Sequence, residues 1–552
     1  MYLIQKLLFN TLFICIFSFI NAQSNAPGSL IWGKDYGEPN NTNATKIIGL
    51  TNDGFYMLRQ KVLNNPEAKP RAWVEFYDND MNLKKSIEQE LKYKGKQRDF
   101  EDVVFLGGEL YLLTSFNNSA KKKNYLFKQQ ISSKSLIPSK SLDMICETDA
   151  RNKEAEGSFG NYVSKDSSYL LIYNDLPYKK NEPERFGFRV FDRNFDLVWE
   201  KDIVLPYPDN QFTVEEYQVD ASGNVHLLGV LYTDQAKWRR RGSPTYQYVI
   251  LSYLDNGEIT EEFRVDLENK FVTDLTFRPV KNGELVCAGF YSEKGTYSVK
   301  GAYYFRLNPR TRATNNTNFQ PFEFDFLTEY MTERSRDKAK AAQARNDVQR
   351  SAELFNYSLD ELITRSDGGA VLVAEQFYIE EDRYNDSPFG YGFGYGYNPY
   401  DPFYYNRYRN NFQVDYYYNY NDIIVVNIRP TGEIEWAARI PKKQQTRNDG
   451  GYYSSYAMSI VRDKLFFIFN DNARNFDGNK KSNRFYNYNG SDSIISLAQI
   501  SKNGEVTTYP LASNRDAGII TRPKMSKQIG KKEMAIFGER GRAYRFGKLT
   551  FE

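Results

Sequence analysis

The sequence predicts an all-β protein, a single β-propeller with eight four-stranded blades. Three observations lead to this fold class. A tight turn followed by an apolar strand recurs eight times along the 552 residues, and a second, alternating strand follows each copy. The stretch "LIWGKDY" (30–36) is similar to "LVWEKDI" (197–203) and "IEWAARI" (434–440), yet it precedes the first repeat. Four-stranded units repeated four to eight times are typical of β-propellers.

Each repeat begins with a turn of Gly, Asn, Asp or Ser and an apolar strand, labelled b. Such residues supply the positive φ that tight hairpins need. The copies are "DGFYML" (53–58), "GGELYLL" (107–113), "DSSYLLI" (166–172), "SGNVHLLG" (222–229), "NGELVCAG" (282–289), "DGGAVLVAE" (367–375), "RDKLFFIF" (462–469) and "KKEMAIFG" (531–538).

The strand that follows, labelled c, alternates between apolar and polar residues and is rich in β-branched and aromatic side chains, as strands are. Its copies are "AWVEFYD" (72–78), "NYLFKQQI" (124–131), "FGFRVFD" (186–192), "YQYVILSYLD" (246–255), "GAYYFRLN" (301–308), "NDIIVVNI" (421–428), "SIISLAQI" (493–500) and "RAYRFGKLTF" (542–551). A weaker strand a precedes each cassette, and a strand d follows a short turn, so each unit is predicted to be an antiparallel meander.

The eighth unit ends at Phe551 after its c strand and has no d strand of its own. We therefore expect the N-terminal strand, 29–37, to complete the C-terminal blade and to close the ring, which removes the exposed sheet edges. Seven blades with an appended sandwich, or two smaller propellers, are the alternatives. The predicted propeller spans 23–552, with blades at about 44–91, 99–144, 160–206, 212–267, 271–322, 354–443, 452–512 and 518–552 plus 29–37.

The first 22 residues have the pattern of a secretory signal peptide. Lys6 precedes the apolar stretch "TLFICIFSFI" (11–20), and a small residue, Ala22, follows it. A membrane span needs about 20 apolar residues, so an uncleaved anchor is the less favoured alternative. The sequence predicts an exported protein that is periplasmic or associated with the outer membrane of a Gram-negative cell.

Composition restricts the partners. The net charge of +3 is too close to neutral to favour nucleic acid. Only Cys146 and Cys287 lie beyond the signal peptide, so no disulfide framework is expected. The stability of the protein must therefore come from its hydrophobic core, and the protein is expected to be a monomer on its own.

Two resemblances follow from these motifs. A Trp that opens a d strand after a turn, as at Trp32, Trp199 and Trp436, resembles eight-bladed quinoprotein-type propellers. The Ala-x-Asp lead of those repeats and a quinone pocket are missing, so no cofactor is expected. The stretches 367–378 and 416–444 are similar to uncharacterised exported propellers of Bacteroidota-type envelopes, which implies export.

In a meander blade, the b–c and d–a connections share one face of the disc, here called the b–c face, and the a–b and c–d turns share the other, the a–b face. Most turns of the a–b face have only a few residues. The b–c face is predicted to be elaborate because it carries a polar helical insertion at 323–357, a Tyr/Gly/Asn-rich loop at 383–420, and basic clusters at 121–123, 178–185, 237–241 and 479–481.

The Tyr-rich loop has two interpretations. It is either a low-complexity tip without a function or a binding surface in which Tyr provides contact area and Gly and Asn provide adaptability, as in paratopes. The basic clusters are likewise either solvated loop tips or a contact for acidic proteins or lipid head groups. The candidate binding residues are Tyr395, Tyr397, Tyr400, Tyr404, Tyr405, Arg407, Tyr408, Arg409, Lys237, Trp238, Arg239 and Arg240.

Candidates for catalysis are few, and the sequence favours a non-enzyme. His226 is the only histidine; its place inside a strand predicts a packed side chain rather than a zinc ligand or a triad member. "DNDMN" (78–82) has the start of a calcium loop but lacks its Gly and its final Glu, so a plain turn is favoured. Glu375 could join a carboxylate pair for sugar hydrolysis, although a solvated strand end is favoured.

The first functional hypothesis is a non-catalytic scaffold that holds a protein partner in the cell envelope through the b–c face. The second is a glycan-binding or glycan-active propeller that uses the Tyr-rich loop. The third is a quinoprotein-like enzyme. Catalytic residues, metal ligands and cofactors are not assigned.

Overall fold

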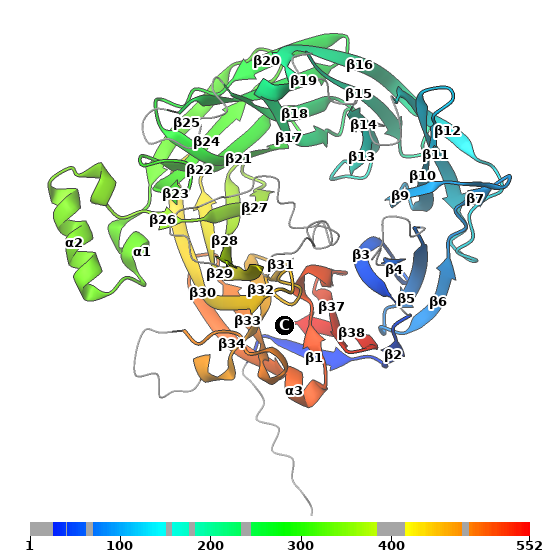
Figure 1. The fold of residues 1–552 in the computed structure, drawn as a ribbon. Coiled ribbons are helices and arrows are strands. Elements are labelled where there is room, and N and C mark those ends of the chain that lie inside the picture. Colours follow the sequence, from blue (N-terminus) through cyan, green and yellow to red (C-terminus); the bar gives the residue numbers. More distant parts are fainter. Residues whose placement is uncertain are drawn as a thin grey trace, which may run out of the picture.

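The computed structural model describes residues 26–39, 41–61, 70–150, 157–175, 183–232, 244–383, 414–476 and 485–552. The four-stranded sheets are arranged around a common axis, and Figure 1 shows the chain running from blade to blade around the ring; the axial region beside the inner strands is called the channel below. Each sheet has four main antiparallel strands in the order inner, middle, middle, outer. The predicted fold class, an eight-bladed β-propeller with one helical insertion, is confirmed.

The blades are numbered along the chain, and their strands keep the letters a to d from the centre outward. The inner a strands are β3 (Thr42–Thr51), β9 (Asp99–Leu106), β13 (Ser158–Val163), β17 (Phe212–Val219), β21 (Phe271–Pro279), β27 (Tyr357–Thr364), β31 (Ala457–Val461) and, in blade 8, β35 (Ile520–Thr521) with β36 (Lys527–Gln528). The b strands are β4 (Gly54–Lys61), β10 (Glu109–Asn118), β14 (Tyr169–Asp175), β18 (Val225–Tyr232), β22 (Leu285–Ser292), β28 (Ala370–Arg383), β32 (Lys464–Asp471) and β37 (Glu533–Arg540).

The c strands are β5 (Ala72–Asp78), β11 (Lys123–Ile131), β15 (Pro183–Asp192), β19 (Tyr246–Leu254), β24 (Gly301–Leu307), β29 (Val414–Ile428), β33 (Ile494–Ile500) and β38 (Ala543–Phe551). The outer d strands are β6 (Leu83–Glu88), β12 (Asp143–Asp149), β16 (Leu197–Pro208), β20 (Ile259–Arg264), β25 (Thr314–Pro321), β30 (Ile434–Arg447), β34 (Val506–Ser513) and β1 (Gly28–Trp32). Short pairs join β7 (Lys92–Tyr93) to β8 (Lys96–Gln97) and β23 (Ser298–Val299) to β26 (Leu354–Phe355), while β2 (Tyr36–Gly37) extends blade 8.

The core is divided among the seams between blades. Each of the eight seams holds one cluster of buried apolar side chains, contributed by the facing sheets of two adjacent blades. A blade is therefore covered on both faces only when both of its neighbours are present, which is why a complete ring is needed to bury the apolar surface.

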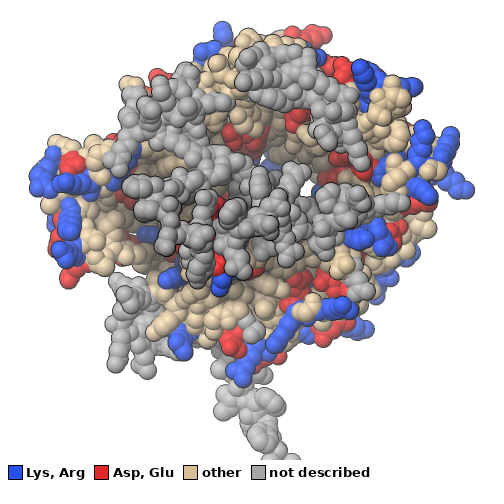
Figure 2. All heavy atoms as spheres, in the orientation of Figure 1, with Lys and Arg blue, Asp and Glu red and all other residues tan. Residues whose placement is uncertain are grey.

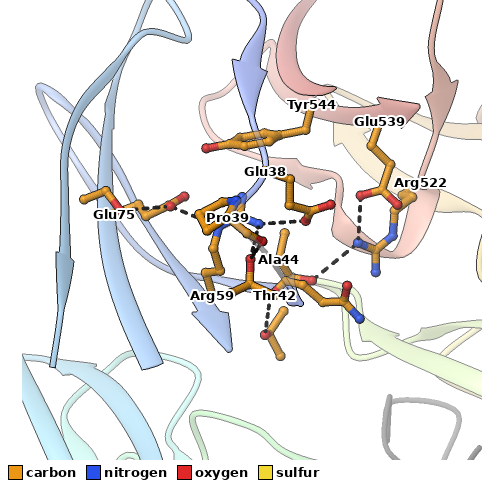
Figure 3. A network of polar contacts seen from close by, with 12 residues as sticks. Glu38, Pro39, Thr42, Ala44, Arg59, Glu75, Arg522, Glu539 and Tyr544 are labelled. Carbon is orange, nitrogen blue, oxygen red and sulfur yellow. Dashed lines mark hydrogen bonds and ion pairs between the residues drawn. The ribbon is translucent and has the colours of Figure 1, made fainter. Parts of the chain in front are cut away.

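Blade 8 is completed by the N-terminal strand, as predicted. β1 pairs with β38 from Gly28 opposite Phe551 to Trp32 opposite Gly547. The segment after β1 is fastened to blade 1 by Glu38, whose Oε1 accepts a hydrogen bond from Nη1 of Arg59 at 2.8 Å. Figure 3 shows Arg59 between Glu38 and Glu75, with the ring of Tyr544 beside it. This network joins blades 8 and 1 where the chain closes on itself.

Two of the repeated d-strand tryptophans bind the next blade. Nε1 of Trp199 in blade 3 donates to the carbonyl of Gly223 in blade 4 at 2.9 Å, and Nε1 of Trp436 in blade 6 donates to the carbonyl of Lys502 in blade 7 at 2.9 Å. The ring of Trp199 lies against Gly257 and that of Trp436 against Gly504. Both glycines have a positive φ, and a Cβ at either position would collide with the Trp ring. The repeated Trp is therefore a contact between neighbouring blades.

The insertion before blade 6 contains α1 (Phe324–Thr328) and α2 (Glu333–Ala344); the short α3 (Asn514–Ala517) follows β34. Figure 1 places α1 and α2 at the outer edge of the ring, beside β23 and β26. Leu327 and Ala339 join the apolar cluster between blades 5 and 6, and the Tyr330 ring lies 4.4 Å from the Arg439 guanidinium. The insertion is thus packed against the ring.

Three predicted boundaries differ from the structure. The Tyr-rich loop is shorter than 383–420 because β29 already begins at Val414, where alternating Tyr and Asn residues extend the strand. The blade 2 connection with the basic cluster 121–123 is a tight turn, and Lys123 there pairs with Glu147 and Asp149 on the rim. The c–d connection of blade 2 is instead the longer one, since β11 ends at Ile131 and β12 begins at Asp143.

Candidate functional site

The inner strands of five blades share an irregularity at the same level of the channel. In blades 1, 2, 4, 5 and 6 the pairing of the a strand with the b strand skips one residue, which makes a β-bulge. Both faces of a blade are covered by its neighbours, so the open side of an a strand is its edge toward the channel. A bulge changes the direction of a side chain, so it can turn a residue of the a strand toward this open edge. The skipped residues are Thr45, Glu101, Glu215, Thr273 and Asp360, and β3 has a second bulge at Ile48.

These residues are not among the predicted binding or catalytic residues, although the sequence contains a signal for them. Each bulge except the one at Ile48 coincides with two adjacent polar residues that interrupt the alternation of the a strand. The pairs are Thr45-Lys46, Glu101-Asp102, Glu215-Glu216, Thr273-Asp274 and Asp360-Glu361. In Figure 2, Asp and Glu are seen both nearer the middle and at the rim of the face in view, whereas Lys and Arg are mostly at the rim.

Two carboxylates next to these bulges, Asp102 and Glu216, form ion pairs with basic side chains. Lys46 in blade 1 lies 2.6 Å from Asp102 in blade 2, which also accepts a hydrogen bond from Nδ2 of Asn161 in blade 3 at 3.0 Å. Arg278 in blade 5 lies 2.6 Å from Glu216 in blade 4. These contacts connect successive blades along the channel and contribute to the stability of the ring.

Three other carboxyl groups, in the adjacent blades 4, 5 and 6, have raised pKa values. Burial raises the pKa of Asp274 to about 7, and the neighbouring charge of Glu215 adds to the shift. Burial also raises the pKa of Glu215. Burial and the charge of Glu375 raise the pKa of Asp360 well above its usual range. This side of the channel therefore concentrates carboxyl groups that resist ionisation.

The raised pKa of Asp274 predicts an unusual pH dependence of stability. The folded protein holds this proton up to about pH 7, whereas the unfolded chain releases it near pH 4, so the free energy of unfolding should fall as the pH rises through that window. Between pH 5 and pH 8 we expect Asp274 to cost about 2 kcal/mol. Urea unfolding of the wild type and of Asp274→Asn measures this effect: the variant should lose less stability over that range, and parallel pH profiles would contradict the assignment.

Blades 6, 7 and 8 contribute a mixed acidic and basic cluster to the same channel. Lys524, from the 3₁₀ turn η6 (Pro523–Met525), donates to the hydroxyl of Tyr420 at 3.0 Å. Burial lowers the pKa of Lys524, and the charges of Glu375 and Asp360 oppose the shift. Oδ2 of Asp360 accepts from the hydroxyl of Tyr456 at 2.8 Å. Lys524 of blade 8 thus lies within the electrostatic influence of the blade 6 carboxylates Glu375 and Asp360.

The prediction that Glu375 is a solvated strand end is wrong. Its side chain is buried, with Nζ of Lys442 at 2.6 Å and the hydroxyl of Ser455 donating at 2.7 Å. Lys442 lies 67 positions later in the chain, on a d strand that is longer than the prediction assumed. Glu375 is electrostatically coupled to Asp360, but in the described residues its own oxygens are occupied by these structural partners.

His226 is packed inside blade 4, as predicted. Its Nδ1 lies 2.9 Å from Oγ of Ser252 and its Nε2 lies 3.5 Å from Oδ2 of Asp220. The three residue types are those of a hydrolytic triad, but all three side chains are buried, and Asp220 also accepts backbone N–H groups of its own turn. A substrate carbonyl has no access to this serine, so the set is structural.

The remaining motifs are also structural. Asp78 accepts from the backbone N–H groups of Asp80 and Asn82, so "DNDMN" forms the predicted c–d turn of blade 1. Cys146 and Cys287 are both buried and unpaired with each other. No group of three or more His, Cys, Asp or Glu residues suited to a metal ion occurs in the described part of the chain.

The predicted signal peptide and the predicted binding residues lie outside the described residues. They are the segment 1–22, the tyrosines and arginines of the Tyr-rich loop (Tyr395, Tyr397, Tyr400, Tyr404, Tyr405, Arg407, Tyr408 and Arg409) and the cluster Lys237, Trp238, Arg239 and Arg240. Among the described residues, no helix is both long enough and apolar enough to cross a membrane.

No model of a known protein family and no curated protein matches this sequence. Among solved structures, the chain is similar to the WD40 domain of SCAP from fission yeast, with 8% identity, a TM-score of 0.36, and coverage of 96% of this chain and 98% of that one. It is also similar to a DUF4221 family member from Bacteroides vulgatus, with 10% identity, a TM-score of 0.29, and coverage of 80% and 92%. A protein of unknown function from Bacteroides caccae has 10% identity, a TM-score of 0.26, and coverage of 75% and 94%.

Proposed function

We propose that this chain is a non-catalytic binding scaffold, exported to the cell envelope, that holds a protein partner through its b–c face. One observation carries this proposal. The outer three strands of blade 6 have 14, 15 and 14 residues, whereas the b strands of blades 4 and 5 have eight. At about 3.3 Å per residue, blade 6 extends roughly 20 Å further than its neighbours.

The extra length lies on the b–c face. At the opposite end, Ala370 pairs with Ile428 and Ile428 with Ile434, so the three strands start level at the a–b face. The extension is well fastened: Arg447 and Asn448 both bind Asp415 across β29 and β30. A ribbon that projects from a rigid ring and is itself braced is suited to present a fixed surface to a partner.

The composition of the extension supports protein contact. Tyr416 and Tyr417 on β29 and Tyr378 and Ile379 on β28 are half-buried, so they combine apolar area with polar groups. Tyr is enriched where proteins contact one another because it supplies a large area with few rotatable bonds. The helices α1 and α2 belong to the d–a connection that precedes blade 6 and lie at the outer edge of the ring.

A scaffold role also agrees with the chemistry of the described residues. The Ser252-His226-Asp220 set is enclosed, and Glu375 is held by Lys442 and Ser455. The proposed address rests on residues 1–22, whose pattern is that of a signal peptide. A partner in the envelope or the outer membrane is therefore the natural candidate.

Two changes that are far apart in sequence should weaken partner binding in different ways. Replacing 389–412 by a short Gly/Ser linker removes contact area and should mainly speed dissociation, whereas converting Lys237, Arg239, Arg240 and Arg241 to Ser should slow association and flatten its salt dependence. Surface plasmon resonance against the partner recovered from crosslinked envelopes measures both rates. Substitutions in turns of the a–b face serve as controls and should leave both rates unchanged: Asn82→Ser, Asn256→Ser and Asn503→Ser. If only these control variants lose binding, the partner binds the a–b face and the proposed binding face is wrong.

A further inference from the structure

A short hairpin at the rim of the ring carries three exposed lysines. It consists of β7 and β8 and belongs to the d–a connection from blade 1 to blade 2, so it lies on the b–c face. Lys92, Lys94 and Lys96 are exposed, and none of them forms an ion pair within the described part of the chain. In Figure 2 a group of Lys and Arg side chains forms the edge of the molecule where Figure 1 places β7.

The tight turn between β10 and β11 lies beside this hairpin and adds more lysines. Nζ of Lys96 lies 5.3 Å from the ring centroid of Phe116, which is two residues before the end of β10. In the turn that follows, Lys121 and Lys122 are exposed, and neither forms an ion pair with a described residue. The exposed lysines of the hairpin and the turn are here called the lysine patch: Lys92, Lys94, Lys96, Lys121 and Lys122.

A buried arginine fixes the base of the hairpin. Arg98 is 3% exposed, and its backbone N–H donates to the carbonyl of Leu91 at 2.9 Å. Its Nη1 donates to Oγ1 of Thr114 at 2.7 Å and to Oε1 of Gln129 at 2.9 Å. These acceptors are neutral, and Arg98 forms no ion pair with a carboxylate of the described chain. The guanidinium therefore holds the hairpin against blade 2 and adds a positive charge beneath the lysine patch.

Carboxylates near the lysine patch are few. Glu90 precedes the hairpin and Asp99 follows it, and both are exposed. Glu147 and Asp149, on the neighbouring d strand, both bind Lys123 at the end of the turn. The basic groups of this part of the rim outnumber these carboxylates, so the patch has a local positive excess in a chain whose net charge is only +3. Such a surface attracts an extended anionic surface rather than a single counter-ion.

The composition of the patch distinguishes a membrane from an acidic protein. Lysine is depleted at protein–protein interfaces, whose centres are apolar and rich in aromatic side chains and Arg. Of the large hydrophobic side chains that are exposed in the described chain, none lies in the hairpin or in the turn. Clusters of four to eight basic residues bind anionic lipid head groups, and each Lys contributes about fivefold in affinity.

We infer that the lysine patch binds a membrane surface that contains anionic phospholipid. This contact goes beyond the proposed function, because it needs no protein partner. The hairpin and the extended blade 6 lie on opposite sides of the ring, and both belong to the b–c face. Binding of the patch to a bilayer therefore turns that face toward the membrane, where a membrane protein is within its reach.

The test is co-sedimentation of the whole protein, as recovered from the cell that produces it, with two kinds of vesicle. One kind is an equimolar mixture of phosphatidylglycerol and phosphatidylcholine, and the other is phosphatidylcholine alone. We expect binding to the anionic vesicles only. Raising the ionic strength from about 0.1 M to about 1 M should abolish this binding, because the Debye length falls from about 10 Å to about 3 Å.

Charge-neutralising variants locate the contact. Lys94 and Lys122 have positive φ and are replaced by Asn, which tolerates that conformation. The hairpin variant, Lys92→Gln with Lys94→Asn and Lys96→Gln, should bind anionic vesicles about 100-fold more weakly, and the turn variant, Lys121→Gln with Lys122→Asn, about 30-fold. The matched control removes the same charge as the hairpin variant from exposed turns of the a–b face and should bind like the wild type: Lys281→Gln, Lys502→Gln and Lys531→Gln.

The outcomes separate this inference from the proposed function, since the vesicles contain no protein. Salt-sensitive binding that the hairpin and turn variants lose and the control keeps supports the membrane contact even if no protein partner is found. Failure of the folded wild type to bind anionic vesicles, or equal losses in the hairpin variant and the control, would overturn it and leave the scaffold proposal standing. If the wild type ignores the vesicles while the hairpin variant loses a crosslinked protein, the patch binds an acidic protein and the membrane contact is wrong. The melting curve of each variant shows whether it is folded.

Discussion

Deleting residues 27–37 should abolish the folded ring or lower the melting temperature by more than about 10 °C. The deletion removes β1 and β2, and with them every partner on the outer side of β38. It also uncovers the apolar cluster between blades 7 and 8, against which Leu30 and Trp32 pack. An open sheet edge next to exposed apolar side chains favours aggregation.

Circular dichroism and size-exclusion chromatography measure this result. The control is Ile31→Ser, because the side chain of Ile31 points outward and is 71% exposed. That variant should melt with the wild type. A deletion variant that elutes as a monomer and melts at the wild-type temperature would show that the N-terminal strand does not close the ring.

Replacing Arg59 by Met should lower the free energy of unfolding at pH 7 by about 3 to 5 kcal/mol, the range found when one partner of a buried ion pair is removed. Arg59 is completely buried and binds Glu38 and Glu75, of which Glu75 is 1% exposed. Without the guanidinium, Glu75 remains as a buried carboxylate whose donors among the described residues are the hydroxyls of Tyr77 and Ser86. The segment that leads from β1 into blade 1 also loses its anchor at Glu38.

The exposed pair Arg71–Glu88 in the same blade provides the matched control. Arg71 and Glu88 are 46% and 40% exposed, and exposed pairs contribute at most about 1 kcal/mol. Urea unfolding of Arg59→Met and Arg71→Met therefore compares the same substitution in two environments. Equal losses would mean that the closing network contributes no more than a surface ion pair.

The architecture could be predicted from the sequence because it depends on local signals that repeat. Three such signals can be recognised from the sequence alone: turn residues that favour positive φ, the alternation of the b and c strands, and the unpaired d strand at residues 29–37. The repeated Trp199 and Trp436 marked the outer strands correctly, although their role as donors to the next blade requires the ring. Closure of the ring could be predicted because the eighth unit has no d strand of its own and residues 29–37 form a d strand without a unit.

The residues along the channel could not be predicted in the same way. A bulge is a relation between two strands, so the side chain of Glu215 is turned toward the channel only through the register of β17 against β18. Glu375 was expected in solvent because it is at the end of a predicted b strand and the sequence does not single out its partner, Lys442 on β30. The pKa of Asp274 is raised mainly by burial and then by Glu215 and Glu216 of blade 4, and this burial depends on how the blades pack.

The face on which a partner binds is tested most directly by crosslinking from single positions in intact envelopes. A photoreactive amino acid at Lys443 on the extended β30 or at Lys340 on α2 samples the b–c face, and the same residue at Asn256 or Asn503 samples turns of the a–b face; all four positions are exposed. A scaffold that works through the b–c face predicts one discrete crosslinked species of the same mass from Lys443 and Lys340, and none from Asn256 or Asn503. The same species from the a–b face positions alone would contradict this function.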